Sequence, residues 1–234
     1  MKKLLLFFSL IVTAVAAKSQ SYNYNMFGVG ANVSAVYPYA DLPIGKYSIA
    51  FNLTGYYNFS PYIPIGLEFQ TGTLSGGDRK LDVHGRQYTN SYKALIVHAD
   101  IYAGQLLDYD FNAFKRVIKD FYVGAGVGVI NNNLTDIVRV QPGKDYVFPG
   151  TNKSSNIVVP LRVGYEFRIN NNFGEQFMGI NVGYITNITW GEGIDGYADP
   201  ASQFKNNALD QYSQIVVGVK FNFGPSRSFY KLID

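Results

Sequence analysis

Residues 157–168, with the sequence IVVPLRVGYEFR, decide the fold class of this chain. Apolar or aromatic side chains occupy nearly all the odd-numbered positions of this stretch, whereas Arg162, Gly164 and Glu166 fall between them. Successive side chains of an extended strand point to opposite faces, so the alternation predicts a β-strand with one apolar and one polar face. Residues 121–129 repeat the pattern with glycine at the alternate positions. Both stretches therefore predict strands whose two faces meet different surroundings.

The alternation recurs eight times along the chain. The segments lie at residues 27–37, 49–59, 63–71, 95–103, 121–129, 157–167, 178–188 and 215–223. Their polar faces carry mostly Gly, Asn, Ser and Thr, with a few charges of both signs: Glu68, Asp100, Arg162, Glu166, Arg168 and Lys220. A water-facing exterior would be rich in Lys and Glu, whereas a narrow barrel interior suits small residues and charges that pair with one another. The sequence therefore predicts an all-β fold, an eight-stranded antiparallel up-and-down transmembrane β-barrel with its apolar face outward.

Composition narrows the class further. Charged residues make up 16% of the 234 residues, below the roughly 25% of ordinary soluble domains. The absence of Cys excludes a disulfide scaffold and Cys-based metal or redox chemistry. Residues 1–19 have the layout of a cleaved signal peptide, with two lysines, an apolar run and small residues before a cleavage point after Ala16 or Ser19. Its removal leaves 17 basic and 17 acidic residues, a balance that argues against a nucleic-acid partner.

Connection lengths give an independent indication of topology. Long polar connections are expected at residues 38–47, 75–91, 131–155 and 189–211, and short ones at 60–62 and 170–176. Long external loops alternating with short periplasmic turns are typical of outer-membrane barrels, with both termini on the periplasmic side. The connection at 106–120 is longer than a turn. It places Phe111, Phe114, Ile118 and Phe121 at helical spacings, which predicts either a short amphipathic helix or a longer turn packed on the barrel end.

Aromatic residues gather at the expected ends of the strands, as in the aromatic belts of membrane proteins. Those expected at the inner rim are Phe27, Phe59, Tyr62, Phe121, Phe167, Phe177, Phe221 and Phe223. Those expected at the outer rim are Tyr37, Tyr47, Tyr92, Trp190 and Tyr212. Enrichment of aromatics in strands generally is the alternative explanation.

Residues 218–223, GVKFNF, resemble the terminal-strand signal read by the barrel assembly machinery: a glycine with aromatic residues three and five positions later. Together with the eight segments, they make residues 25–223 similar to the small bacterial outer-membrane barrels of the OmpA and OmpX type, the "outer membrane protein beta-barrel domain" family. Two departures are Val216, where a polar residue is usual, and the eleven residues after Phe223. The resemblance implies a signal peptide at 1–19, a barrel at 20–223, a periplasmic tail at 224–234 and residence in the cell outer membrane.

Two groups of residues are candidates for chemistry. His98 and Asp100 share the inward face of one segment, a possible His with an acidic orienter, although the sequence identifies no nucleophile and a hydrogen-bonded lumen pair is the simpler interpretation. His84, with Asp78 and Asp82, occupies a loop in which metal-ligand spacing is incomplete.

Two further patterns lack the rest of their motifs. Glu192, Asp195 and Asp199 place acidic oxygens in the last long loop without the ligand series of a calcium loop. The glycines of residues 122–130 lack the helix and Lys of a phosphate-binding loop. We therefore expect no catalytic, cofactor-binding or metal-binding residues.

The function expected from the sequence is a structural or interaction role, exerted through the long external loops and without catalysis. The expected partners are outer-membrane lipids, the barrel assembly machinery during biogenesis, and an envelope or extracellular protein. Three alternatives remain at this point: an outer-membrane barrel enzyme acting on lipid or peptide, an accessory barrel of a secretion system, and a soluble lipocalin-like carrier. The carrier would require the apolar faces to point inward, and the Gly-x-Trp signature usual near its first strand is absent.

Overall fold

The computed structural model describes residues 21–40, 42, 44–107, 112–172, 174–191, 193–198 and 209–230. Its elements are β1 Ser21–Tyr39, β2 Gly45–Lys46, β3 Ser48–Ser60, β4 Ile63–Gly77, β5 Gln87–Tyr102, η1 Ala103–Gln105, α2 Ala113–Ile118, β6 Phe121–Ile137, β7 Lys153–Asn170, β8 Gln176–Trp190 and β9 Gln211–Tyr230. None of the helices in this part of the chain has the length and apolar character needed to cross a membrane. The predicted signal peptide at 1–19 lies outside the described residues.

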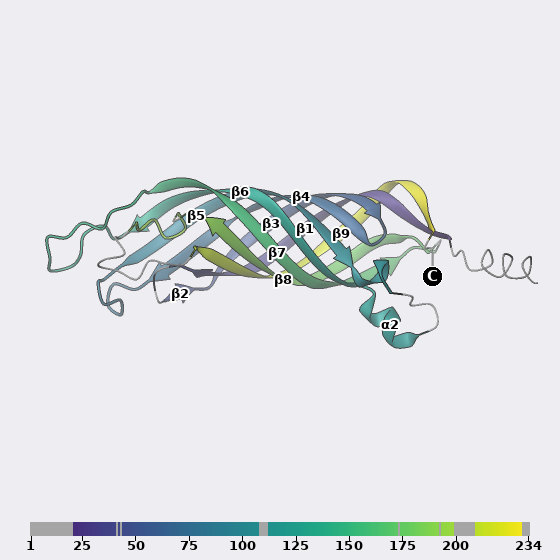
Figure 1. The fold of residues 1–234 in the computed structure, drawn as a ribbon, viewed down its shortest axis with the longest axis horizontal. Coiled ribbons are helices and arrows are strands. Elements are labelled where there is room, and N and C mark those ends of the chain that lie inside the picture. Colours follow the sequence, from purple (N-terminus) through teal and green to yellow (C-terminus); the bar gives the residue numbers. More distant parts are fainter. Residues whose placement is uncertain are drawn as a thin grey trace, which may run out of the picture.

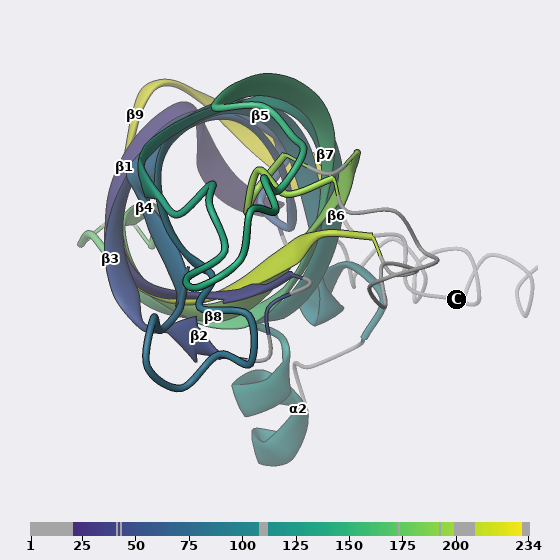
Figure 2. The ribbon, with the colours of Figure 1, turned by 90° about the vertical axis from the view of Figure 1, so that its left-hand side faces the viewer.

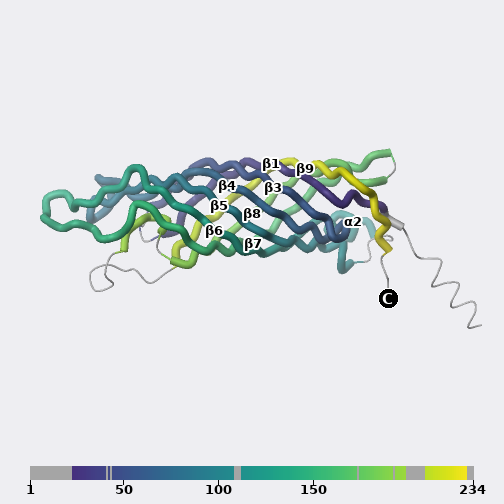
Figure 3. The backbone as a smooth tube through the Cα atoms, turned by 90° about the horizontal axis from the view of Figure 1, so that it is seen from above, coloured from purple at the N-terminus to yellow at the C-terminus, as the bar shows by residue number. Residues whose placement is uncertain are grey.

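The long strands form one closed antiparallel ring of eight. Each pairs with the next along the chain, β2 adds a short bridge to β4, and β1 pairs with β9 to close the ring. Figures 1 and 2 show the ring from the side and along its axis, and in Figure 3 the strands run obliquely around that axis. The eight-stranded up-and-down barrel predicted from the alternation is confirmed.

The apolar face of every long strand points outward. Along β3, Phe51 is 62% exposed and its neighbour Asn52 is buried inside the ring. On β5, Val97 faces outward and His98 faces inward in the same way. Exposing so much apolar surface to water is unfavourable, so the wall is suited to lipid. This orientation is the reverse of the one that a soluble carrier with an apolar interior would need.

Connections of unlike length separate the two ends of the barrel. At one end, called the loop end, lie the connections at 40–47, 78–86, 138–152 and 191–210. At the other end, called the turn end, lie the connections at 61–62, 103–120 and 171–175, together with the first residues of β1 and the last residues of β9 (Figure 1). The alternation of long and short connections matches the prediction. The strands reach further into the loop end than expected, because β5 already begins at Gln87 and β6 ends at Ile137.

The connection at 103–120 contains a short helix, as one of the two predictions had it. The side chain of Asn112 accepts hydrogen bonds from the N–H groups of Phe114 and Lys115 and so caps α2. The hydroxyl of Tyr165 on β7 donates a hydrogen bond to the carbonyl of Val117 at 3.0 Å and fixes the helix beside the barrel wall. Phe111 lies outside the described residues.

Beyond Phe223, the chain does not leave the barrel at once. Seven of the eleven residues that the sequence analysis set apart as a tail continue β9 to Tyr230 and pair with the beginning of β1. The ring of Phe229 packs against that of Tyr62 at 6.2 Å, across the turn end. The last residues, 231–234, lie outside the described part of the chain.

The aromatic belts are confirmed in part. Phe27, Phe59, Phe121, Phe167, Phe177, Phe221, Phe223, Tyr47 and Trp190 are exposed on the outer wall. In contrast, Tyr92 and Tyr212 are buried inside the barrel, so their assignment to the outer rim was wrong. Tyr62 does lie at the turn end, but it is buried there and not exposed on the wall. Tyr92 shares the strand face of His98, and Tyr212 shares that of Gln214, so the period of two already placed both rings inward.

Candidate functional site

The turn-side half of the lumen holds a group of charged side chains that we call the ionic cluster: Glu68, His98, Asp100, Asp120, Arg162, Glu166, Arg168 and Lys220. At its centre, Arg162 on β7 reaches side chains of β4 and β5, two strands that it does not pair with. Its Nη1 lies 3.1 Å from Glu68 Oε2, and its Nε lies 3.1 Å from Asp100 Oδ1. All three side chains are buried. A buried charge is tolerated only when it is paired in good geometry, and both carboxylates meet this condition through one guanidinium.

A second group of charges, made by Arg168, Asp120 and Glu166, continues the ionic cluster toward the turn end. Arg168 Nε lies 2.9 Å from Asp120 Oδ1 and 3.8 Å from Glu166 Oε1. Glu166 Oε2 also accepts a hydrogen bond from the hydroxyl of Tyr102 at 2.9 Å. The guanidinium of Arg168 lies over the rings of Tyr62 and Tyr102, at 4.8 and 4.6 Å. Aromatic rings and an ion pair therefore close this mouth together.

Lys220 completes the ionic cluster without a direct carboxylate contact. Its Nζ donates a hydrogen bond to Asn58 Oδ1 at 3.1 Å and lies 4.5 Å from the centre of the Tyr56 ring. The mutual pairing of lumen charges that the sequence predicted is confirmed for the other five residues named there. Asp120 was missed because it precedes β6 and lies outside the alternating pattern.

The loop-side half of the lumen contains a different filling, which we call the apolar plug. Its buried members are Val36, Leu42, Ala50, Leu74, Tyr88, Tyr92, Ala94, Ile96, Ile130, Leu134, Phe148, Val158, Ile194, Tyr197 and Tyr212. Phe148, Ile194 and Tyr197 come from the long loops and not from the strands. The loops therefore fold back into the barrel mouth, where segments of them are seen in Figure 2.

The two fillings leave little room around them. A Cβ placed on Gly66 would lie 2.3 Å from His98 Nε2, and one on Gly124 would lie 2.0 Å from Asp100 Oδ1. Glycine is needed at these strand positions because the ionic cluster occupies the space that a side chain would take. The lumen is thus a packed interior, as expected for a barrel of eight strands.

His98 and Asp100 are brought together, as the sequence predicted. His98 Nδ1 lies 3.4 Å from Asp100 Oδ2, and Nε2 lies 3.7 Å from Glu68 Oε2. His98 is 1% exposed. The imidazole lies between two carboxylates inside a packed lumen, but neither of its ring nitrogens makes a hydrogen bond with the described part of the chain. The hydrogen-bonded pair expected from the sequence is therefore seen only as a close approach of the two side chains.

A single tyrosine ties the long loops together. The hydroxyl of Tyr197 lies 3.0 Å from the carbonyl oxygen of Gln87 and 2.9 Å from that of Val138. The guanidinium groups of Arg86 and Arg139 each lie 5.7 Å from its ring centre. Burial raises the pKa of Tyr197 to about 12, so its hydroxyl remains a donor at neutral pH. We call this arrangement the loop cap.

The loop end also exposes apolar side chains above the loop cap. Leu81 and Val83 belong to the connection at 78–86, and Val140 and Val147 to that at 138–152, where they face each other across an antiparallel bridge. All four are more than half exposed, and Val83 reaches 88%. The side chains of His84 and Gln141 approach to 3.3 Å and join the two loops. Sequence reasoning missed this surface, because isolated apolar residues in polar loops carry no periodic signal.

The loop acids act as turn formers. Asp82 Oδ1 accepts hydrogen bonds from the N–H groups of His84 and Arg86, both at 2.9 Å, and Asp78 Oδ1 accepts one from that of Lys80. The last contact lowers the pKa of Asp78. Asp195 is buried and accepts from the N–H of Tyr197.

Metal binding gains no support from this geometry. No group of three or more His, Asp or Glu side chains suited to a metal ion occurs in the described part of the chain. Of the acids considered for calcium, Glu192 and Asp199 lie outside that part.

A closed ring of eight antiparallel strands, with an apolar outer wall and an interior filled by side chains, is the architecture of small β-barrels of the outer-membrane type. The chain resembles solved structures of that class. Neisserial surface protein A aligns at 9% identity and a TM-score of 0.48, over 84% of this chain and 97% of the other. Ail of Yersinia pestis, crystallised with the heparin analogue sucrose octasulfate, aligns at 12% identity and a TM-score of 0.43, over 84% of this chain and 97% of the other.

The outer membrane protein OprG of Pseudomonas aeruginosa aligns at 12% identity and a TM-score of 0.42, over 87% of this chain and 98% of the other. No protein-family model and no curated protein sequence matches the chain. At these sequence identities the similarity concerns the fold alone. The assignment of the fold therefore rests on the strand ring and its outer wall.

Proposed function

We propose that this chain is exported by its N-terminal signal, spans an outer membrane, and serves as a non-catalytic interaction protein that binds another protein through its loop end. One observation carries the proposal: Leu81, Val83, Val140 and Val147 are exposed on loops that are themselves held in place. Exposed apolar side chains grouped on a fixed surface are typical of protein interaction sites. Loops that are already ordered lose little conformational entropy on binding.

The closed ring supports the membrane location. Each of the eight long strands pairs on both sides around the ring, so no strand edge needs water along the wall. The termini of the described chain lie at the turn end and the long connections at the other, which is the arrangement of outer-membrane barrels with long external loops.

The absence of Cys makes orientation directly testable. We expect a Val83→Cys variant, expressed in a diderm bacterium, to be labelled on intact cells by a membrane-impermeant maleimide. A Ser228→Cys variant, at the turn end, should be labelled only after the cells are opened. The protein should also migrate faster before boiling than after it. Labelling of both positions on intact cells, or a protein released without detergent, would refute the membrane arrangement.

Interaction through the loop end is tested by cross-linking in living cells. A photoreactive amino acid replaces Val83 or Val147 in one set of variants and Lys144, an exposed residue of the same loops, in the control. We expect a discrete adduct with a second protein from the first two positions. A separate variant without the photoreactive amino acid, in which Leu81, Val83, Val140 and Val147 are all changed to Ser, should no longer co-purify with that protein. Its gel mobility should stay normal. Equal adducts from Lys144, or none from any position, would contradict the proposal.

The non-catalytic part of the proposal has its own test. His98→Ala removes the histidine that an enzyme of this kind would need, and the burial of this side chain in the lumen supports a role other than catalysis. We expect cells that carry this variant to have the same envelope lipid composition, by mass spectrometry, as cells with the unchanged chain and as a deletion strain. A lipid species that is lost in both the His98→Ala and the deletion strain would show that the barrel is an enzyme.

A further inference from the structure

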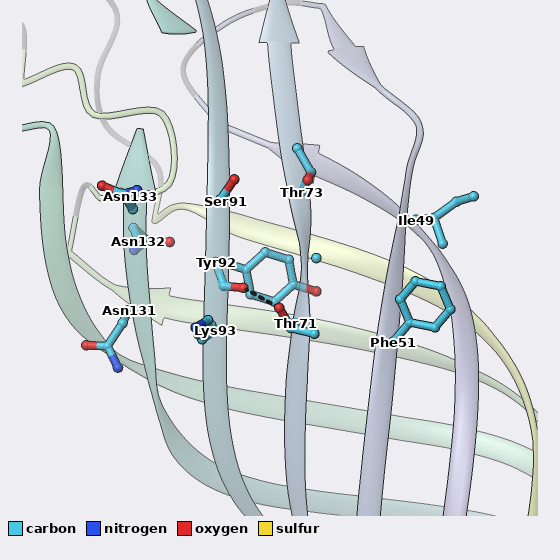
Figure 4. Close-up of a pocket in the computed structure, with 11 residues that line it drawn as sticks. Ile49, Phe51, Thr71, Thr73, Ser91, Tyr92, Lys93, Asn131, Asn132 and Asn133 are labelled. Atoms are coloured by element: carbon cyan, nitrogen blue, oxygen red, sulfur yellow. Dashed lines mark hydrogen bonds between the residues drawn. The ribbon is translucent and has the colours of Figure 1, made fainter. Parts of the chain in front are cut away.

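The outer wall carries a hollow near the loop end. It is separate from the exposed apolar residues of the loops described above. It has a volume of about 560 Å³ and lies across β3, β4, β5 and β6. Figure 4 shows Thr71, Thr73 and Ser91 in its middle, with Phe51 to one side and Lys93 and Asn131 to the other. Short side chains between longer ones produce the depression. The hollow is therefore a property of the outward-facing sequence of four adjacent strands.

The strand register places this hollow at a sharp chemical boundary. Leu53, Phe69, Leu95, Val129 and Ile157 are register partners on consecutive strands and form an apolar row around the wall. Two residues nearer the loop end, the corresponding row reads Phe51, Thr71, Lys93, Asn131 and Ser155. Two residues along a strand span about 7 Å. The wall thus changes from wholly apolar to polar and cationic over one step.

Two lysines give the polar side of the boundary its charge. Lys93 is the register partner of Asn131, and Lys153 is the register partner of Asn133 in the next row. Both lysines are exposed, and neither makes an ion pair with the part of the chain that the structure describes. Asp136 lies further toward the loop end and accepts a hydrogen bond from the Gln87 side chain at 3.0 Å. The two ammonium groups are therefore available to an anion.

We infer that this hollow binds the headgroup of a membrane lipid that carries phosphate on a sugar. Lys93 lines the hollow, Lys153 lies beside it as the register partner of the lining residue Asn133, and together they supply the charge for phosphate. The hydroxyls and amides of Thr73, Ser91, Asn131 and Asn133 match sugar hydroxyls. Phe51 and the apolar row below provide a surface for acyl chains. Basic residues close to a membrane surface recognise anionic lipids in this way. The inference rests on the proposed membrane location, because only a chain held at that depth presents the hollow to headgroups.

The test uses the full-length mature chain in nonionic detergent with diphosphoryl lipid A as the probe, and native mass spectrometry to measure bound lipid. At about 1 kcal/mol per lysine near a membrane surface, losing one lysine reduces affinity about fivefold and losing both about 25-fold. We expect this loss in Lys93→Gln/Lys153→Gln. The matched control, Lys80→Gln/Lys144→Gln, removes two loop lysines outside the hollow and should bind like the unchanged chain.

A second variant tests the hollow apart from its charge. Ser91→Phe fills the space and keeps both lysines, and we expect a loss of at least tenfold. Dephosphorylated lipid A and phosphatidylcholine should bind weakly to all variants. Equal binding of phosphorylated and dephosphorylated lipid would overturn the inference, as would equal losses in the two double variants. Displacement of the lipid by an equal concentration of inorganic phosphate would reduce the site to an ion site and also overturn it.

The outcome is separable from that of the proposed function. A chain whose gel mobility shifts on boiling, and whose Val83→Cys variant is labelled on intact cells, confirms the membrane arrangement whatever the lipid result. If that chain binds lipid A no better than phosphatidylcholine, only the lipid site is lost. If the chain is soluble without detergent, the proposed function fails first.

Discussion

The two halves of the lumen solve the same packing problem with opposite chemistry. On the turn side, Arg162 stabilises Glu68 and Asp100 by contacts of 3.1 Å between strands far apart in the sequence. On the loop side, Ile96 and Ile130 pack with aromatic rings and with residues of the loops. An ionic network requires every member in place, whereas an apolar filling tolerates replacement in proportion to the volume lost. The halves should therefore differ in how they respond to substitution.

This difference also separates the roles of the two ends. The apolar plug includes Phe148, Ile194 and Tyr197 from the long loops, so packing in the loop-side half orders the surface proposed to bind a partner. The ion pairs of Arg162, in contrast, join strands β4, β5 and β7 to one another. Damage to the cluster should weaken the barrel, and damage to the plug should also reach the loop surface.

The largest effect is expected from Arg162→Met. The change leaves Glu68 and Asp100 buried without their shared partner, and removing one member of a buried ion pair costs about 3–5 kcal/mol. Urea unfolding of the chain in lipid vesicles, followed by the gel mobility of the folded form, measures the loss. Adding Glu68→Gln to Arg162→Met should recover part of it by removing one uncompensated carboxylate. If Arg162→Met alone lowers the free energy of unfolding by less than 1 kcal/mol, the contacts of Arg162 with Glu68 and Asp100 do not hold the ionic cluster together.

Next in size is Ile96→Ala in the apolar plug. Truncating a buried Ile costs about 2–5 kcal/mol, through lost transfer free energy and the cavity that remains. The same unfolding measurement applies, with Leu95→Ala, on the outward-facing side of the same strand, as the matched control. We also expect faster proteolysis of the loops in Ile96→Ala than in Arg162→Met at equal loss of stability. The reverse order would break the link between the plug and the loops.

A smaller loss is expected from Gly124→Ala. The new Cβ would lie 2.0 Å from Asp100 Oδ1 and 2.7 Å from the carbonyl oxygen of Ala99, and overpacking of this kind costs about 1–3 kcal/mol. Gly55→Ala is the matched control, because a Cβ at Gly55 meets no heavy atom within 4 Å. Similar unfolding midpoints for the two variants would mean that the ionic half has more free space than the distances indicate.

The smallest effect concerns the hydroxyl of Tyr197. Removing it in Tyr197→Phe takes a donor from the carbonyl of Val138 and an acceptor from the N–H of Gln87, whereas the carbonyl of Gln87 still accepts from the N–H of Val138. The loss should cost about 1 kcal/mol, seen as faster amide hydrogen exchange in the loops alone. The pKa of Tyr197 in the folded chain, about 12, lies above the ordinary value of 10.0. Its stabilising contribution is therefore complete below pH 10 and is lost as the pH rises toward 12. Exchange in Tyr197→Phe should lack this alkaline step, and an identical step in both chains would refute the role of the hydroxyl.

Most of the barrel follows from local sequence, because the period of two fixes which side chains share a face. It placed Arg162 and Glu166 inside and Phe167 outside, as the structure has them. The prediction was wrong for Tyr92 and Tyr212, which were placed at the outer rim because they lie near strand ends. Their even-numbered positions in the alternating pattern already indicated that they face inward. The short helix at 113–118 was one of two structures that the apolar spacing of this connection allowed, the other being a longer turn packed on the barrel end.

The sequence by itself determined the strand ring, the direction of its faces and the need of its lumen charges for partners. The tertiary structure alone decided which charges meet, because Arg162 lies 94 residues from Glu68 along the chain and reaches it through the register of four successive strands. It also decided that Leu81, Val83, Val140 and Val147 are exposed on two loops joined by the side chains of His84 and Gln141, and that Lys93 and Lys153 lie at the edge of an apolar row. Periodicity acts between near neighbours in sequence, whereas these groupings depend on closure of the ring and on how the loops fold into it.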